Sequence, residues 1–145
     1  MAVAQSTYAA RQPQYVLGQI VNQELHNSVS RILEDTTAGY GVAMFVGTGD
    51  KGVTATPGTK FEGVTIRDVI IEGATADTFY DGATLSLCEK GVIVVQASVA
   101  VDRGAQAYVT DAGAWTDVAT DNNIIPGAFF DESTSGAGLV ALRIN

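Results

Sequence analysis

The sequence predicts an all-β protein, on three observations. Sixteen glycines supply many turns. Charged residues make up only 17% of the chain, fewer than long amphipathic helices need. Short β-branched runs alternate with turns rich in Gly and Asp about every 8–12 residues, which is typical of a β-sandwich or barrel. In a chain of 145 residues we therefore expect one antiparallel β domain.

The predicted strands follow one another with short connections. They cover residues 15–21, 29–34, 40–46, 61–67, 83–88, 92–101, 105–110, 114–116, 128–131 and 139–144. Turns are expected at residues 89–91, 102–104 and 111–113, because each ends in glycine after a charged or small residue. Residues 22–30 form either a loop or a short helix, and residues 69–71 are a further short apolar run.

The clearest strand begins at residues 92–95, which are four apolar residues in succession. A strand without a polar face is expected to be covered on both sides. We expect the barrel interior to cover one face and another subunit to cover the other.

The first 14 residues differ from the rest of the chain. Residues 1–14 are small and polar, with Pro13 near their end, and they show neither helical nor strand periodicity. We expect an extended arm here, either frayed or ordered on a neighbouring subunit, and a single β domain over residues 15–145.

Residues 47–52 match the glycine pattern G-x-G-x-x-G of dinucleotide-binding proteins. That chemistry needs a helix to begin inside the motif, so that its amide groups face the pyrophosphate. The following residues 53–58 are β-branched and contain Pro57, which excludes such a helix. The motif therefore predicts a hairpin loop, and no cofactor is expected.

Candidate catalytic and metal-binding groups are few. His26 is the only histidine and Cys88 the only cysteine, which excludes an internal disulfide and a metal site built from several His and Cys ligands. No nucleophile elbow accompanies His26, and Cys88 lies in an alternating strand, as a structural thiol does. Asp117 and Asp121 with Asn122 and Asn123, and separately Asp77 and Asp81, make a calcium site conceivable, but neither set has EF-hand spacing and both fit ordinary surface loops. We expect no enzyme activity.

The charge balance limits the partners. The formal net charge is −8, and the three lysines are scattered. A field of this sign repels nucleic acid and anionic membranes, so neither is an expected partner. No segment approaches the roughly 18 apolar residues of a membrane span, and the first residues lack the apolar core of a secretory signal.

Three large aromatic residues lie near predicted turns, namely Trp115, Phe129 and Phe130. Core packing is their first explanation. Successive residues of a strand point to opposite faces, however, so one of Phe129 and Phe130 must face away from the core. We therefore predict that these aromatic residues contribute to a subunit interface.

Several segments, in this order, resemble a known family. They are Gly39-Tyr40-Gly41-Val42-Ala43, Lys60-Phe61-Glu62-Gly63-Val64-Thr65, Tyr80-x-x-Gly-x-x-Leu-Ser-Leu, Gly91-Val92-Ile93-Val94-Val95, Gly104-Ala105-Gln106-Ala107-Tyr108-Val109 and Gly136-Ala137-Gly138-Leu139-Val140-Ala141-Leu142. Over residues 17–145 this order is similar to that of the capsid cement, or head decoration, proteins of tailed bacteriophages. Residues 22–30 and 117–123 show no family pattern.

The resemblance implies a small β-barrel or tulip-like domain that binds the outer surface of a capsid. Its implied partners are the major capsid protein and copies of itself, commonly as a homotrimer, and its implied role is to bridge neighbouring capsomers. We expect Tyr8, Arg11, Pro13 and Tyr15 of the arm region to contact the capsid. A phage tail or spike component and a carbohydrate-binding β module share this composition. The enzyme alternative is a small β-barrel hydrolase that would use His26.

Overall fold

The computed structural model describes residues 15–21, 24–68 and 78–145, and in these residues every regular element is a strand. The strands are β1 (Asn27–Leu33), β2 (Thr37–Ala38), β3 (Ala43–Val46), β4 (Gly52–Thr54), β5 (Phe61–Thr65), β6 (Phe79–Tyr80), β7 (Thr84–Ala97), β8 (Gln106–Val109), β9 (Trp115–Thr116), β10 (Asn123–Phe130) and β11 (Gly138–Ile144). The all-β prediction is confirmed. The described residues include no helix long and apolar enough to cross a membrane.

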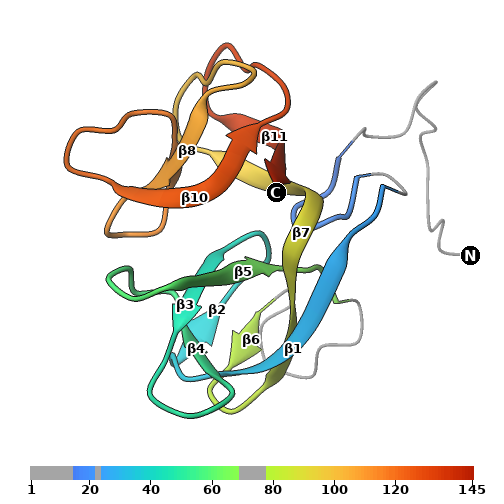
Figure 1. Cartoon of the computed structure of the whole chain (residues 1–145), viewed down its shortest axis with the longest axis vertical. Helices are drawn as coiled ribbons and strands as arrows, with labels where there is room; N and C mark the ends of the chain where they lie inside the picture. The colour runs from blue at the N-terminus through green and yellow to red at the C-terminus, as the bar shows by residue number, and fades with distance from the viewer. Residues whose placement is uncertain (1–14, 22–23, 69–77) are drawn as a thin grey trace, which may run out of the picture.

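The strands close into two rings that share β7 (Figure 1). In the N-terminal barrel the order is β1-β4-β3-β5-β7, and β7 pairs back with β1. In the C-terminal barrel the order is β7-β11-β10-β8-β9, and β9 pairs back with β7. Each ring contains one parallel pair, β1 with β4 and β7 with β9, so the barrels are mixed and the purely antiparallel expectation is wrong on this point. Ring closure leaves few exposed strand edges.

Strand β7 runs through both barrels, and the turn predicted at residues 89–91 is wrong. Lys90 pairs with Asn27 of β1, and Gly91 pairs with Ile144 of β11, so the ladder continues across the position of the expected turn. Gly91 has a φ of +127°, a conformation that glycine tolerates and other residues rarely adopt. The strand therefore changes direction at Gly91 without ending.

The core consists of two clusters of buried side chains. One fills the N-terminal barrel and includes Leu33, Met44 and Leu87. The other fills the C-terminal barrel and extends to the outer side of the N-terminal one, where it includes Phe45 and Cys88. Alternate residues of β3 and β7 thus face different clusters, as the two-residue period of a strand requires.

The second face of the strand at residues 92–95 is covered by this chain alone. All four residues are at most 1% exposed in a single copy, so the expectation that another subunit covers them is wrong. Part of the reason lies in the segment at residues 18–21, which runs along β7: Gly18 N donates to Val94 O at 3.0 Å, and Val21 N donates to Val92 O at 3.0 Å.

Most predicted strands agree with the observed ones to within a few residues, but the strand predicted at 128–131 already begins at Asn123, and β2, β4 and β6 were not predicted as strands. The first predicted strand is not a strand. Residues 15–21 form only an isolated bridge between Ile20 and Ile93, because Gly18 with a φ of +79° interrupts the extended chain. The segment at residues 22–30 becomes the beginning of β1 from Asn27 onward. The predicted arm at residues 1–14 and the apolar run at 69–71 lie outside the described residues.

Candidate functional site

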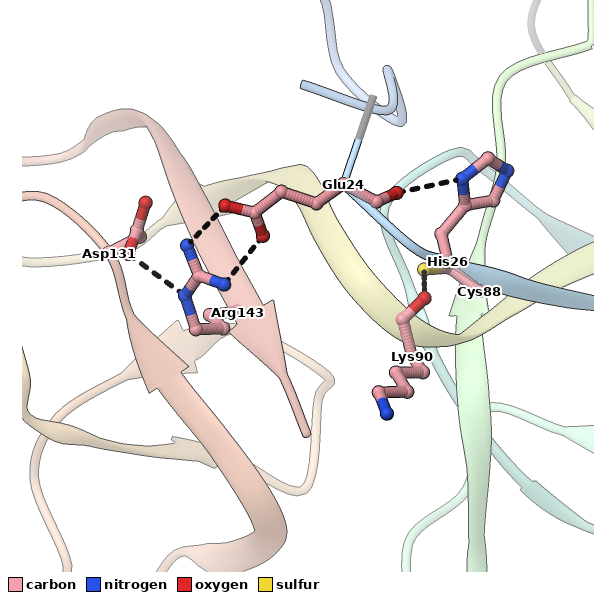
Figure 2. Close-up of polar contacts among 6 residues, drawn as sticks. All are labelled: Glu24, His26, Cys88, Lys90, Asp131 and Arg143. Carbon is pink, nitrogen blue, oxygen red and sulfur yellow. Dashed lines mark hydrogen bonds and ion pairs between the residues drawn. The ribbon is translucent and has the colours of Figure 1, made fainter. Parts of the chain in front are cut away.

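The two candidate catalytic side chains lie near each other but do not form a reactive pair. Both side chains lie next to Gly91. A Cβ added to Gly91 would lie 2.7 Å from His26 Cβ and 3.7 Å from Cys88 Sγ. The Cys88 thiol is directed to Lys90 O at 3.3 Å, and the exposed His26 ring lies 3.4 Å from Glu24 O through Nδ1 (Figure 2). Burial raises the pKa of Cys88 to about 11, so the thiol stays protonated at neutral pH. This geometry supports a structural thiol.

The glycine-rich loop binds a side chain of the protein itself. Residues 47–52 connect β3 to β4 as a hairpin, which confirms the prediction. Thr48 N donates to Glu34 Oε2 at 3.0 Å, and the Thr48 hydroxyl donates to the same carboxylate. These two hydrogen bonds lower the pKa of Glu34. The loop amides therefore meet a protein carboxylate instead of a phosphate.

Nothing in the described part of the chain resembles a metal site. No three His, Cys, Asp or Glu side chains gather there in a way that could hold an ion. In the loop at residues 117–122, Asp117 accepts a hydrogen bond from Asp102 N at 3.3 Å, and the amide of Asn122 donates to Val118 O at 2.9 Å.

A charged cluster fixes the N-terminal segment to the C-terminal barrel. Arg143 of β11 binds both carboxylate oxygens of Glu24, at 2.6 and 3.1 Å, and binds Asp131 at 3.2 Å (Figure 2). Glu24 first and Asp131 second raise the pKa of Arg143 further above its usual range. The Tyr15 hydroxyl also donates to Glu132 in the loop between β10 and β11. Tyr15 and Glu24 are therefore held against the C-terminal barrel.

An open pocket of about 520 Å³ lies where the two barrels meet. The N-terminal half contributes Gly39, Tyr40 and Arg67, and the C-terminal half contributes Ala97 and Trp115. Trp115 Nε1 donates to Gly41 O at 2.8 Å and so connects the two halves at the pocket. Half of its lining residues are glycine or alanine, whose small size leaves the space open. Its described lining is mostly apolar, and Arg67 is the one charged side chain in it.

The structure separates the three predicted interface residues. Trp115 is 2% exposed and Phe130 is 1% exposed in a single copy, so both are accounted for as core residues. Phe129 points the other way and is half-buried, as the alternation predicted. Only Phe129 remains available for a contact between subunits, and that role stays a prediction.

The predicted capsid-contacting residues are mostly outside the described part of the chain. Tyr8, Arg11 and Pro13 lie there, while Tyr15 is half-buried and already bonded to Glu132. The sequence did not indicate the charged cluster around Arg143 or the pocket beside Arg67. Both join segments far apart in the chain, and no local pattern marks either one.

Comparisons with known proteins identify one family and find two solved structures that resemble this chain. The model of the family described as "Structural cement protein (E217 gp24/Pam3 gp6)" matches residues 4–145. The fold is similar to a chain of "The capsid of Myoviridae Phage XM1", with a TM-score of 0.74, 15% identity, and coverage of 100% of this chain and 98% of that one. A weaker similarity, with a TM-score of 0.49 and 11% identity over 83% of this chain and 95% of the other, is to the head fiber gp8.5 N base of bacteriophage phi29. No curated protein matches the chain.

Proposed function

The chain belongs to the structural cement protein family of phages, and we propose that it binds the outer surface of the assembled capsid and stabilises the head by bridging neighbouring capsomers. Family membership makes it a structural component of the phage virion. The bridging role, the position on the outer surface and the absence of catalysis are parts of the proposal.

The observation on which the proposal rests is the extent of the family match, which covers residues 4–145 and so includes most of the predicted arm. The shared fold with a phage capsid chain is consistent with it. The net charge of −8 suits an outer surface, because a protein of this sign would be repelled by packaged DNA.

The physical mechanism is linkage between binding and assembly. A protein that binds the assembled shell, and binds the separate subunits more weakly, shifts the equilibrium toward the shell. Many copies on one shell add their contributions, so each interface can be modest, of about 1,000 Å². Two barrels that share one long strand form a stiff body, which is what a bridge between subunits needs. We further propose self-association, commonly a homotrimer in proteins of this kind, with Phe129 at the contact.

The test uses heads that lack this protein. Purified protein is mixed with undecorated heads and sedimented, and the heads are then heated with and without it. We expect saturable retention on the heads and a higher temperature of DNA release. Retention without any gain in head stability would contradict the cementing role. A lack of retention would contradict the whole proposal.

A further inference from the structure

The pocket between the barrels has one cation at its mouth. The guanidinium of Arg67 lies over the ring of Tyr40, with 5.5 Å between Cζ and the ring centroid. Arg67 is exposed, and within the described part of the chain its side chain forms no ion pair. Arg31 and Arg143, in contrast, are both paired with carboxylates.

The stacking leaves the N–H donors of the Arg67 guanidinium available to hydrogen-bond a group on a binding partner. An arginine on an aromatic face keeps the edge of its guanidinium available, and that edge fits a carboxylate with two hydrogen bonds. Tyr40 is itself held in the core, at 4% exposure, so the cation is placed on a rigid support. Beside it lies the apolar hollow of about 520 Å³, large enough for one or two side chains.

We propose that this pocket is where the capsid subunit docks, through an extended segment that presents an apolar side chain next to a carboxylate. A partner carboxylate is repelled by most of a surface with a net charge of −8, and Arg67 is the one cation in the lining of this pocket, so Arg67 fixes the orientation of a carboxylate that docks there. This inference rests on the proposed function, because it names the surface through which that function would operate.

Three variants test the pocket. Arg67→Glu reverses the charge at its mouth. Gly39→Phe adds bulk at a lining position where an added Cβ meets no atom within 4 Å and where φ is not positive, so the backbone tolerates a side chain there. Arg103→Glu is the matched control. Like Arg67, Arg103 is exposed and forms no ion pair among the described residues, but it does not line the pocket.

We expect Arg67→Glu and Gly39→Phe to reduce retention on undecorated heads by about tenfold or more, a typical loss for one well-placed contact. Arg103→Glu should bind as the wild type does. Equal losses for Arg67→Glu and Arg103→Glu would assign the effect to net charge and overturn the docking site. Wild-type retention by both pocket variants would overturn it while leaving the proposed function intact.

A second measurement addresses the pocket without heads. Trp115, the only tryptophan, lines the pocket, so its fluorescence reports on occupancy. Titration with the peptide acetyl-Leu-Asp-Leu-amide should change this fluorescence, whereas acetyl-Leu-Lys-Leu-amide should not, and Arg67→Glu should abolish the response. If the heads do not retain the wild-type protein, the proposed function is wrong, and this titration alone tests whether the pocket binds a carboxylate. Equal responses to both peptides, or no response, would exclude the site.

Discussion

At the scale of single residues, the carboxylate of Glu34 accepts hydrogen bonds from Thr48 in the loop at residues 47–52. An added Cβ would lie 1.7 Å from Glu34 Oε2 at Gly47 and 1.8 Å from it at Gly52. The glycines are therefore needed because they leave room for the carboxylate. Gly49 of the same loop has only one neighbour within 4 Å, at 3.9 Å.

We expect Gly47→Ala to lower the melting temperature, because the new methyl group displaces Glu34 from Thr48. Gly49→Ala is the control in the same loop and should have a much smaller effect. In a Glu34→Ala background the methyl group at position 47 meets less obstruction, so the two changes should not be additive. Thermal melts of the four proteins in this cycle measure the coupling, and additive effects would contradict the explanation.

The same interaction gives a pH dependence with a defined sign. The pKa of Glu34 is lowered from its ordinary value of 4.5, so the stabilisation is complete above that value and is lost as pH falls through the lower pKa of the folded state. The difference in melting temperature between the wild type and Glu34→Ala should thus shrink below about pH 4.5.

The sequence predicted part of this loop. Glycine spacing and Pro57 correctly indicated a hairpin in place of a phosphate-binding turn. The partner carboxylate was not predictable, because Glu34 lies 14 residues before Thr48 and meets it only through the pairing of β1 with β4.

At the scale of elements, β7 determines the architecture. Its 14 residues pair with β1 and β5 in one barrel and with β11 and β9 in the other. The sequence predicted the two halves of this strand but placed a turn between them. The sequence Glu89-Lys90-Gly91 is compatible with a turn and also with a bent strand. The pairing with β1 and β11 determines that it is a bent strand.

The bend at Gly91 can be tested against a glycine with a similar φ. Gly91 has a φ of +127° and Gly58 has a φ of +129°, but only at Gly91 would a Cβ meet a neighbour, His26 Cβ at 2.7 Å. Both alanine variants place a side chain at a positive φ, which costs free energy at either position. We expect Gly91→Ala to lower the free energy of unfolding by about 1–3 kcal/mol more than Gly58→Ala does, the usual cost of overpacking. Urea denaturation followed by Trp115 fluorescence measures the difference, and equal losses would place the whole effect in the backbone.

At the scale of the whole molecule, the closing contacts lie far apart in sequence. The β1–β7 and β7–β9 pairings close the barrels, and the bond from Trp115 to Gly41 spans 74 positions. Strand period and turn residues predicted the class of fold, whereas ring closure depends on these distant pairings. For the same reason Trp115, an interface candidate in the sequence, lies in the core, and the pocket beside it could not be anticipated.

The last prediction concerns the arm. Residues 1–14 precede Tyr15 and Glu24, whose contacts with Glu132 and Arg143 hold the start of the domain in place. Deleting residues 1–14 leaves those contacts intact, so we expect the free energy of unfolding to change by less than about 0.5 kcal/mol. Retention on undecorated heads should nevertheless fall by about tenfold or more, because a bridging protein loses one of its linked contacts.

A full-length variant with Tyr8, Arg11 and Pro13 each replaced by alanine distinguishes the arm's side chains from its length. If these residues contact the capsid, the variant should lose as much retention as the deletion does. Undiminished retention by the deleted protein would show that the two barrels alone hold the shell. The pocket beside Arg67 would then be the principal candidate for the contact, since it lies in the part of the chain that the deletion leaves unchanged.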